Sequence, residues 1–526
     1  MTTTETTTLT QLSARALAER IARGEVSAVE AVEAYIARIE AVNPALNAVV
    51  VKRYDAARAE ARAADERRAA GEPLGPLHGV PITIKEAFDL TGTPSTYGLP
   101  TRAAALAPAD DEYVRRLRQA GAIILGKTNV PQLLLYNETD NPLYGRTNNP
   151  WDVTRTPGGS SGGQAAIIAA GASPLGLGSD IGGSIRVPAA YCAIAGIRPT
   201  AGRLPDSAEF GVAPGQTAIV SQAGPLGRTV DDVALALDIL NGGRSPDAEP
   251  PRPLGDHTAV DIASLRVAYY SDDGILPPAP AVRRAVVEAA GILAGRGAQV
   301  TEWRPPTPRA ALDLWLGILA ADGAATARHM LKGNARDPRI GRLVFLAARS
   351  RPTLAFLRGL LTVLGQRNAA AVLRDFGRRD TAHYWALVEA QRAYQRQFAH
   401  ALDADDGGPF DVIICPASPT PAFPHGLGGD LLTSGAYAVL YNVLGYPAGV
   451  VPVTRVRPGE DTSRRRSLDT MNRAAQKADQ GSAGLPVGVQ VVARPWRDHV
   501  ALAAMRAIEE SARLQPDYPH APPPPL

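Results

Sequence analysis

One stretch of this 526-residue chain restricts its fold and chemistry more than any other: a glycine- and serine-rich run between Arg155 and Arg186. The run holds two clusters, GGSSGG at 158–163 and IGGS at 181–184. Glycine lets the backbone approach a ligand closely, and consecutive glycine N–H groups can converge on an anion. Each cluster also places a serine hydroxyl beside these donors. A nucleophile beside N–H groups that stabilise an oxyanion is what acyl transfer requires.

A flexible loop or a phosphate-binding loop is the alternative interpretation of either cluster. The nucleotide-binding patterns do not fit, because no Gly-Lys-Ser/Thr ends the run and Gly176-Leu-Gly178 lacks the third glycine of the dinucleotide fingerprint. The sequence therefore favours acyl transfer. Without further information it does not choose the nucleophile among Ser160, Ser161 and Ser184.

A serine nucleophile needs a general base, and two kinds of residue could supply it. Lys85 ends the apolar run 77–84, where alternation predicts a strand, and burial lowers the pKa of a lysine so that a neutral amine can accept a proton. An ion pair with a buried carboxylate is the alternative for Lys85, but the nearby serine clusters favour the serine–lysine arrangement. Triad partners are distant in sequence, so the histidines also stay open as bases: His78, His257, His329, His383, His400, His425, His499 and His520.

Three separated segments carry a resemblance to a known family. They are GVPITIK at 79–85, GRTNNPWDVTRTPGGSSGG at 145–163 and SPLGLGSDIGGSIRVPA at 173–189. With them the chain resembles the amidase signature family of serine–lysine amide hydrolases, over about residues 10–510. Glu86 after Lys85, Gln132 in NVPQ and the segment 440–453 are similar to the fatty acid amide hydrolase branch. We expect no counterpart of the membrane-spanning N-terminal helix that the animal enzymes of that branch have.

The resemblance implies a role for each residue of the site. Ser184 is expected to be the nucleophile, Ser160 a bridging serine in a cis peptide bond with Gly159, and Lys85 the base. The backbone N–H groups of Ile181, Gly182, Gly183 and Ser184 are expected to hold the oxyanion. Leu134 and Leu135 stand where the branch has larger side chains of the acyl channel, and Asn137 stands where it has an aromatic one. Cys192 lies in an apolar neighbourhood and is expected to be a buried, inert thiol.

Strand and helix patterns alternate along the chain, which predicts an α/β fold with a mixed, twisted sheet covered by helices. We expect a single domain over residues 1–526, with an exposed polar excursion at 455–483 and a proline-rich tail at 511–526. Strands are predicted at 77–84, 122–125, 265–270, 412–415, 449–454 and 486–492. Helices are predicted at 12–42 (as a pair), 56–70, 112–120, 164–170, 229–240 and 280–296, and a loop at 204–220.

The segment 339–374 combines seven arginines and no acidic residue with many leucines. Leu357, Leu360, Leu361 and Leu364 fall on one helical face, as in a helix that lies in a membrane interface. Packing of these leucines in the core is the alternative. The resemblance favours a membrane-facing cap at 339–376, because the fatty acid amide hydrolase branch has its membrane-binding cap in this region.

Composition and charge limit the partners. The formal net charge of +3 does not indicate nucleic acid binding, and with two cysteines and no histidine signature we expect neither a metal nor another cofactor. No signal peptide or spanning helix is evident, so we expect a cytoplasmic protein that contacts membranes at most peripherally. A homodimer is also possible from the sequence.

The favoured function is hydrolysis of fatty acid or other hydrophobic acyl amides. Small aryl or alkyl amides, carbamates or esters are the alternative substrates, and an amidotransferase subunit or a non-catalytic lipid-binding protein is a further alternative.

Overall fold

A computed structural model describes residues 9–205, 215–241, 252–462, 464 and 467–523. This range includes all three segments that carry the family resemblance, at 79–85, 145–163 and 173–189. Three predicted features fall partly outside it: the loop at 204–220, the excursion at 455–483 and the tail at 511–526.

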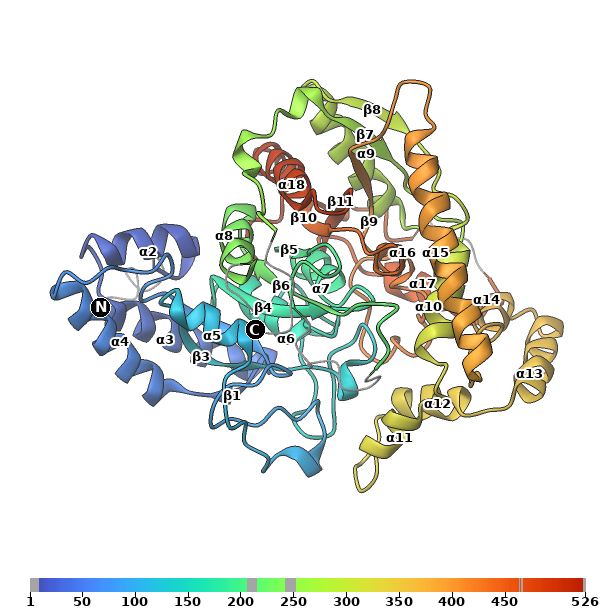
Figure 1. Cartoon of the computed structure of the whole chain (residues 1–526), viewed down its shortest axis with the longest axis horizontal. Coiled ribbons are helices and arrows are strands. Elements are labelled where there is room, and N and C mark those ends of the chain that lie inside the picture. Colours follow the sequence, from blue (N-terminus) through green and yellow to red (C-terminus); the bar gives the residue numbers. More distant parts are fainter. Residues whose placement is uncertain (1–8, 206–214, 242–251, 463, 465–466, 524–526) are drawn as a thin grey trace.

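The described strands form one mixed sheet, in the order β1-β3-β2-β4-β6-β5-β10-β11-β9-β7-β8 (Figure 1). This sheet confirms the predicted α/β fold class. Its middle is antiparallel, whereas β2 runs parallel to both β3 and β4, and β7 runs parallel to β8 and β9. The strands are β1 (Val49–Lys52), β2 (Pro81–Lys85), β3 (Ile123–Thr128), β4 (Leu175–Asp180), β5 (Ala195–Arg198), β6 (Gln222–Gly227), β7 (Arg266–Tyr269), β8 (Gln299–Glu302), β9 (Val412–Pro416), β10 (Ala448–Arg455) and β11 (Pro486–Ala493).

Helices pack around this sheet, and α7, α9 and α18 contact its central strands β10 and β11. The helices around the sheet are α2 (Ala14–Ala22), α3 (Ala28–Leu46), α4 (Tyr54–Ala69), α5 (Glu112–Gln119), α6 (Gly162–Ala169), α7 (Arg186–Cys192), α8 (Val230–Asn241), α9 (Pro280–Gly295), α16 (Ala436–Leu444), α17 (Thr470–Asp479) and α18 (Asp498–Ala512). A second group, on one side of the molecule in Figure 1, comprises α10 (Pro308–Leu319), α11 (Ala325–Met330), α12 (Pro338–Ala347), α13 (Arg351–Val363), α14 (Arg367–Val372) and α15 (Thr381–Asp403).

The glycines of β4 explain why α6 packs so close to the sheet. A Cβ on Gly176 would lie 2.0 Å from Nε2 of Gln164, and one on Gly178 would lie 2.9 Å from Oγ of Ser161. Only glycine leaves room for both side chains, and Gln164 uses that room to donate a hydrogen bond to Thr83 Oγ1 at 2.7 Å. The glycine run thus brings the start of α6 against β2 and β4.

The predicted elements agree with the structure, apart from their exact bounds, and two expectations need correction. The strand predicted at 77–84 is shorter, Pro81–Lys85, and it is buried along its whole length. The segment 455–483 is not wholly an exposed excursion, because α17 lies within it and buries Met471, Ala474, Ala475 and Ala478. Its polar composition concealed an amphipathic helix whose small alanines face the core. That the whole chain is one domain stays a prediction.

The segment predicted as a cap is helical, and its apolar residues are not uniformly buried. We call α12–α14 the cap helices; α13 lies at the periphery of the molecule in Figure 1. Leu354 is the buried residue of α13, whereas Phe356, Leu360 and Val363 are 72%, 47% and 85% exposed. On the leucine face itself, Leu360 and Leu364 are 47% and 60% exposed, and Leu357 and Leu361 are half-buried, so these leucines are not packed in the core. Among the described residues, no helix is long and apolar enough to cross a bilayer.

Candidate active site

Lys85 lies at the end of β2 and contacts two serine hydroxyls. Its side chain is fully buried, and Nζ donates hydrogen bonds to Ser160 Oγ at 2.7 Å and to Ser179 Oγ at 2.9 Å. Because β2 and β4 are parallel neighbours, their carboxyl ends meet at one edge of the sheet, which brings Lys85 beside Ser179. The peptide bond between Gly159 and Ser160 is cis, as the resemblance implies.

The three candidate serines differ in what they reach. Ser160 and Ser161 are 2% and 0% exposed, and Ser161 Oγ donates to the backbone oxygen of Ser179 at 3.4 Å. Ser184 is 8% exposed and lies in the wall of a cavity. The N–H of Ser161 donates to the carbonyl oxygen of Ser184 at 3.1 Å, so the two clusters are in direct contact. Ser184 therefore lies in the cavity wall, whereas Ser160 is buried outside that wall and is hydrogen-bonded to Lys85.

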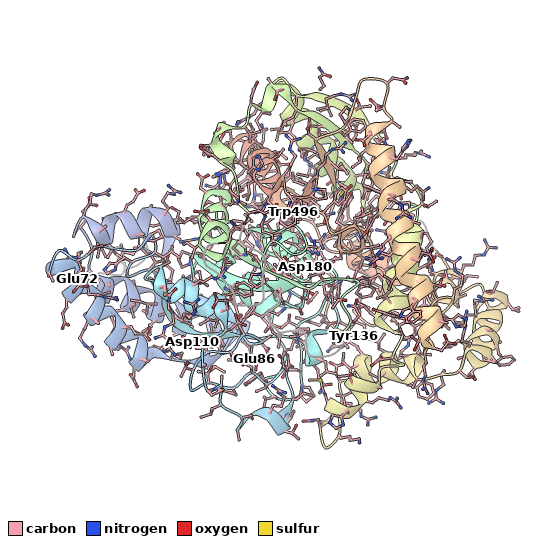
Figure 2. The ribbon with its side chains drawn as sticks, in the orientation of Figure 1. Glu72, Glu86, Asp110, Tyr136, Asp180 and Trp496 are labelled. Atoms are coloured by element: carbon pink, nitrogen blue, oxygen red, sulfur yellow. The ribbon has the colours of Figure 1, made fainter. Side chains whose placement is uncertain are left out.

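A fully buried ion pair supports the loop that carries Ser184. Arg186 donates to both carboxylate oxygens of Asp180, at 2.8 and 2.9 Å, and also to Asn442 Oδ1 and Gln490 Oε1. Burial opposes ionisation, but the Arg186 guanidinium holds the pKa of the Asp180 carboxyl well below its usual range. Asp180 lies near the middle of the molecule in Figure 2. Its carboxylate accepts from the N–H groups of Gly183 and Ile185, at 2.8 and 3.1 Å, and thereby shapes the turn.

One of the four N–H groups that were predicted to hold the oxyanion already donates a hydrogen bond within the turn. The Gly183 N–H is the engaged one, because it donates to the Asp180 carboxylate. Within the described chain, the N–H groups of Ile181, Gly182 and Ser184 donate no intramolecular hydrogen bond. Gly182 and Ser184, together with Ile181, belong to the cavity wall. These free donors beside a hydroxyl suit an oxyanion-binding site.

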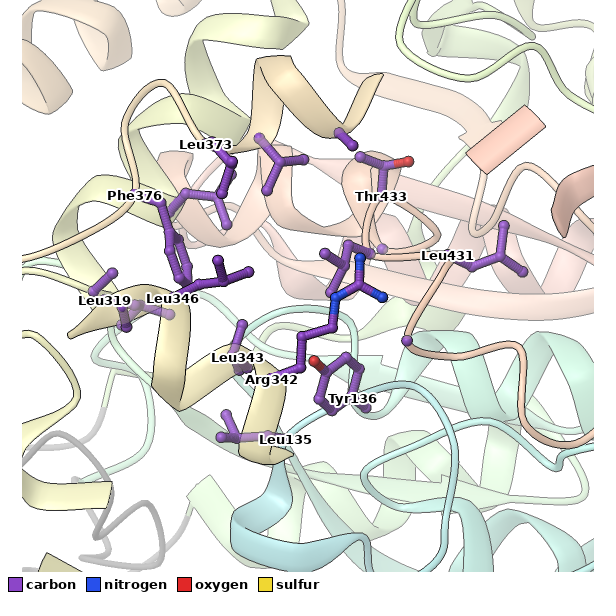
Figure 3. A pocket seen from close by; sticks show the side chains of 18 of the residues that line it. Leu135, Tyr136, Leu319, Arg342, Leu343, Leu346, Leu373, Phe376, Leu431 and Thr433 are labelled. Atoms are coloured by element: carbon purple, nitrogen blue, oxygen red, sulfur yellow. The ribbon is translucent and has the colours of Figure 1, made fainter. Parts of the chain in front are cut away.

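The cavity has a volume of about 530 Å³, within the range of small-molecule sites. Figure 3 shows its wall, where Leu343 and Leu346 from α12 lie near Leu319 from α10 and Phe376. Leu134 and Leu135 also line it, together with Asn137. The charged Arg342 and Asp430 in the wall pair with each other at 3.3 Å. The wall is thus mainly apolar. Besides the serine turn and this ion pair, its polar residues include Asn137, Asp322, Gln366, Thr433, Ser434 and Thr470.

The loop that carries Leu134 is tied to the cap helices. Leu133, Leu134 and Tyr136 have φ values of 56°, 57° and 79°, a left-handed conformation that is costly for such side chains and is typical of functional segments. Tyr136 donates from its hydroxyl to the carbonyl oxygen of Arg339 at 2.9 Å. Arg339 also pairs with the buried Glu138 at 2.8 Å. Helix α12 and this loop therefore form one continuous part of the cavity wall (Figure 3).

The histidines and Cys192 do not line the cavity in whose wall Ser184 lies. Among the described residues, which include all eight histidines, no histidine lines the cavity. Cys192 is fully buried, and burial raises the pKa of its thiol well above the usual value, so the thiol stays protonated at neutral pH. In the same described range, no three His, Cys, Asp or Glu side chains form a group that could hold a metal ion.

Ser179, Asp180 and Arg186 contact the site but did not stand out in the sequence analysis. All three lie inside the motif at 173–189, so their proximity to Ser184 along the chain was the available signal. Trp315, whose indole contacts the serine turn, gave no such signal, because α10 lies more than a hundred residues further along the chain.

Comparison with known proteins places this site in a family. Residues 30–502 match the amidase family. The chain belongs to the amidase family. It is 35% identical to fatty-acid amide hydrolase 1 of Sus scrofa over 512 residues, which covers 94% of this chain and 84% of that protein. It is 34% identical to indoleacetamide hydrolase of Bradyrhizobium diazoefficiens, covering 95% and 87% of the two chains. A solved fatty acid amide hydrolase superposes with a TM-score of 0.84 at 27% identity, covering 97% of this chain and 87% of that one.

Membership of this amidase family agrees with the resemblance seen in the motifs. The protein is an amide-hydrolysing enzyme of the amidase signature type, and it is related to fatty acid amide hydrolases. In the structure, Lys85 contacts Ser160, and the N–H of the adjoining Ser161 donates to the carbonyl oxygen of Ser184.

Proposed function

We propose that this enzyme cleaves amides of hydrophobic acyl groups through Ser184, Ser160 and Lys85. One observation carries the proposal: Ser184 faces an aliphatic cavity, while Ser160 lies behind it on the buried Lys85. A nucleophile has to reach the substrate, whereas a proton relay has to connect it to a base away from water. The positions of the two serines fit these separate requirements.

The reaction follows from this arrangement. Neutral Lys85 accepts a proton from Ser160, which accepts one from Ser184, and Ser184 Oγ forms a bond to the amide carbonyl carbon. The negative charge that develops on the carbonyl oxygen is stabilised by the free N–H groups of Gly182 and Ser184. The relay returns the proton to the leaving nitrogen, the C–N bond breaks, and the amine departs. Water then attacks the acyl-enzyme ester by the same relay and releases the carboxylic acid.

The aliphatic wall supports a hydrophobic acyl group over a polar one. Each methylene of the substrate that leaves water for this wall contributes up to about 0.8 kcal/mol. A glutamine-sized substrate would need partners for both its α-amino and its carboxylate group. In the wall, Arg342 is already paired with Asp430 at 3.3 Å, and the Asp322 carboxylate accepts from the N–H groups of Ala324 and Thr326. Small aryl or alkyl amides are the second candidate, which the similarity to indoleacetamide hydrolase supports.

A series of anilides that differ only in acyl length tests the substrate class. We expect kcat/KM to rise at least about tenfold from the acetyl to the decanoyl anilide, because longer chains bury more apolar surface. Leu343→Ser and Leu346→Ser should reduce the ratio of kcat/KM for the decanoyl anilide to kcat/KM for the acetyl anilide, since both side chains line the cavity. Leu468→Ser, at a residue that is 83% exposed and outside the cavity wall, is the matched control and should leave the ratio unchanged. Equal kcat/KM values for all chain lengths would favour small amides instead.

The exposed apolar residues of the cap support peripheral contact with a membrane, from which a hydrophobic amide would enter. Leu357, Leu360 and Leu361 line the cavity, so replacing them would alter substrate binding as well as membrane contact. Phe356, Val363 and Leu364 are 72%, 85% and 60% exposed and do not line it. These three outward residues therefore separate membrane contact from catalysis.

We expect the wild-type protein to bind anionic liposomes, with binding that weakens as salt screens the arginines of the cap. Replacing Phe356, Val363 and Leu364 together by serine should weaken binding at least about tenfold, because their apolar surface no longer enters the interface. Turnover of a short, water-soluble anilide should stay unchanged. Leu514→Ser, at a residue 84% exposed on another part of the surface, is the control. Unchanged liposome binding by the triple variant would refute the membrane contact.

A further inference from the structure

The indole of Trp315 contacts the turn that precedes Ser184 in two ways. Its Nε1–H donates a hydrogen bond to the carbonyl oxygen of Ile181 at 2.9 Å. Its ring also lies against Gly182, because a Cβ built on that glycine would be 2.8 Å from Cζ2 of the indole. Trp315 belongs to α10, which contributes Leu312, Leu316 and Leu319 to the cavity wall. The side chain thus reaches from the wall of the cavity to the backbone of the serine turn.

This contact determines the direction of a neighbouring N–H group. The carbonyl of Ile181 and the N–H of Gly182 belong to one planar trans peptide unit, in which they point in opposite directions. When Trp315 holds the carbonyl oxygen, the Gly182 N–H is directed away from the indole. Among the described residues that N–H has no acceptor, although Gly182 lies in the cavity wall.

Hydrogen bonds also orient the next peptide units of the turn, but their partners are residues close to the turn in sequence. Asp180 accepts from the Gly183 N–H at 2.8 Å, and the Val187 N–H donates to the Gly183 carbonyl oxygen at 2.8 Å, which directs the Ser184 N–H the opposite way. Asp180 and Val187 lie within a few residues of the turn. Trp315 is the holding group that comes from a distant helix.

We propose that Trp315 is a positioning residue for the oxyanion-binding turn, because its indole N–H orients the Ile181–Gly182 peptide so that the Gly182 N–H is directed at the oxyanion. The inference rests on the proposed role of Ser184. It assigns Trp315 a function beyond that of an apolar wall: a wall residue contributes to substrate binding, whereas an orienting hydrogen bond contributes mainly to the transition state, in which the oxyanion forms. The glycine at 182 fits this assignment, because a side chain there would displace the indole.

The test removes the indole N–H and keeps an aromatic side chain at position 315. Trp315→Phe and an isosteric variant with β-(3-benzothienyl)alanine, in which sulfur replaces the N–H, are compared with the wild type on a decanoyl anilide. We expect kcat to fall about tenfold in both variants, less than the roughly 10²–10³-fold caused by loss of a whole oxyanion donor, and KM to change less than about twofold. Trp303→Phe is the matched control, because Trp303 packs against Phe398 and Phe410 away from the cavity. It should retain the wild-type kcat.

The inhibition constant of a decanoyl trifluoromethyl ketone is a measurement that would not change if Trp315 had only a structural role. Its adduct with Ser184 carries an oxyanion, so its inhibition constant should rise by the factor by which kcat/KM falls, while the dissociation constant of the matching alcohol stays constant. A raised KM with unchanged kcat, or an unchanged ketone inhibition constant, would overturn the inference. If Trp315→Phe does not fold, the benzothienyl variant decides.

The outcomes also separate this inference from the proposed function. A wild-type enzyme that hydrolyses the anilide at Ser184, together with a fully active benzothienyl variant, would refute the role of Trp315 alone. If turnover of the anilide survives the Ser184→Ala substitution, the proposed mechanism is refuted and, with it, the role of Trp315.

Discussion

Replacing Ser184 by alanine is expected to lower kcat for amide hydrolysis by roughly 10⁵-fold or more, the scale of losing a serine nucleophile. The reason is that Ser184 lies in the cavity wall, where we propose that it forms the covalent bond, whereas we propose that the buried Ser160 relays protons. Ser160→Ala should therefore leave more activity, with a loss of about 10²–10⁴-fold as for a general acid–base group. Both values come from steady-state kinetics of the purified variants.

Covalent labelling identifies the nucleophile independently of these rates. A fluorophosphonate should modify Ser184 of the wild type, as found by mass spectrometry of its peptides, and should not react with the Ser184→Ala protein. Ser27→Ala removes a half-buried hydroxyl that caps α3, far along the chain from the site, and should keep full activity and labelling. A label on Ser160 or Ser161 in the wild type would show that the nucleophile has been assigned to the wrong serine.

Replacing Lys85 by alanine is expected to cause the second large loss, most severe near pH 7. Without the amine that contacts Ser160, no group accepts the proton, and the loss should approach that of the nucleophile itself at neutral pH. Activity should recover in part as pH rises, because hydroxide replaces the missing base. Lys85→Arg should not restore activity, since a guanidinium stays protonated and cannot accept a proton. The measurement is kcat/KM between pH 6 and 10.

Lys127 offers a matched control for the loss of a buried lysine. Burial lowers the pKa of its ammonium to about 8, and Nζ donates to Ser95 Oγ at 2.9 Å and contacts no residue of the proposed triad. Lys127→Met should lower the melting temperature, because it removes a positive charge near the buried Glu86, but the folded enzyme should keep its kcat. Full activity of Lys85→Ala at pH 7 would instead mean that a histidine is the base.

The glycine–serine clusters and the apolar strand that ends in Lys85 could be recognised from the sequence, because each is a continuous stretch of the chain. Glycine allows a tight turn wherever it occurs, and a run of apolar residues that ends in a lysine predicts a buried strand with a charged end. The same local logic predicted most of the strands and helices around the sheet. It did not identify α17, because its alanines are too small to mark a buried face among so many charged neighbours.

The choice among three serines was not decided locally. Ser160, Ser161 and Ser184 have similar neighbours in sequence, and they differ only in whether the folded chain places them at the cavity or behind it. The sequence of the cap was equally insufficient. Its leucine pattern indicated a helix with an apolar face, but only the packing of α13 separates the residues that line the cavity from those that are exposed.

By itself, then, the sequence determined the α/β class, the family and the chemical groups of the site, since these depend on residue type and short spacing. The tertiary structure alone showed which of the three serines lines the cavity, which N–H groups stay free and how Trp315 reaches Ile181. The physical reason is that exposure and hydrogen bonding depend on contacts between segments far apart in the chain. Such contacts arise when the sheet and the helices pack, and no local pattern encodes them.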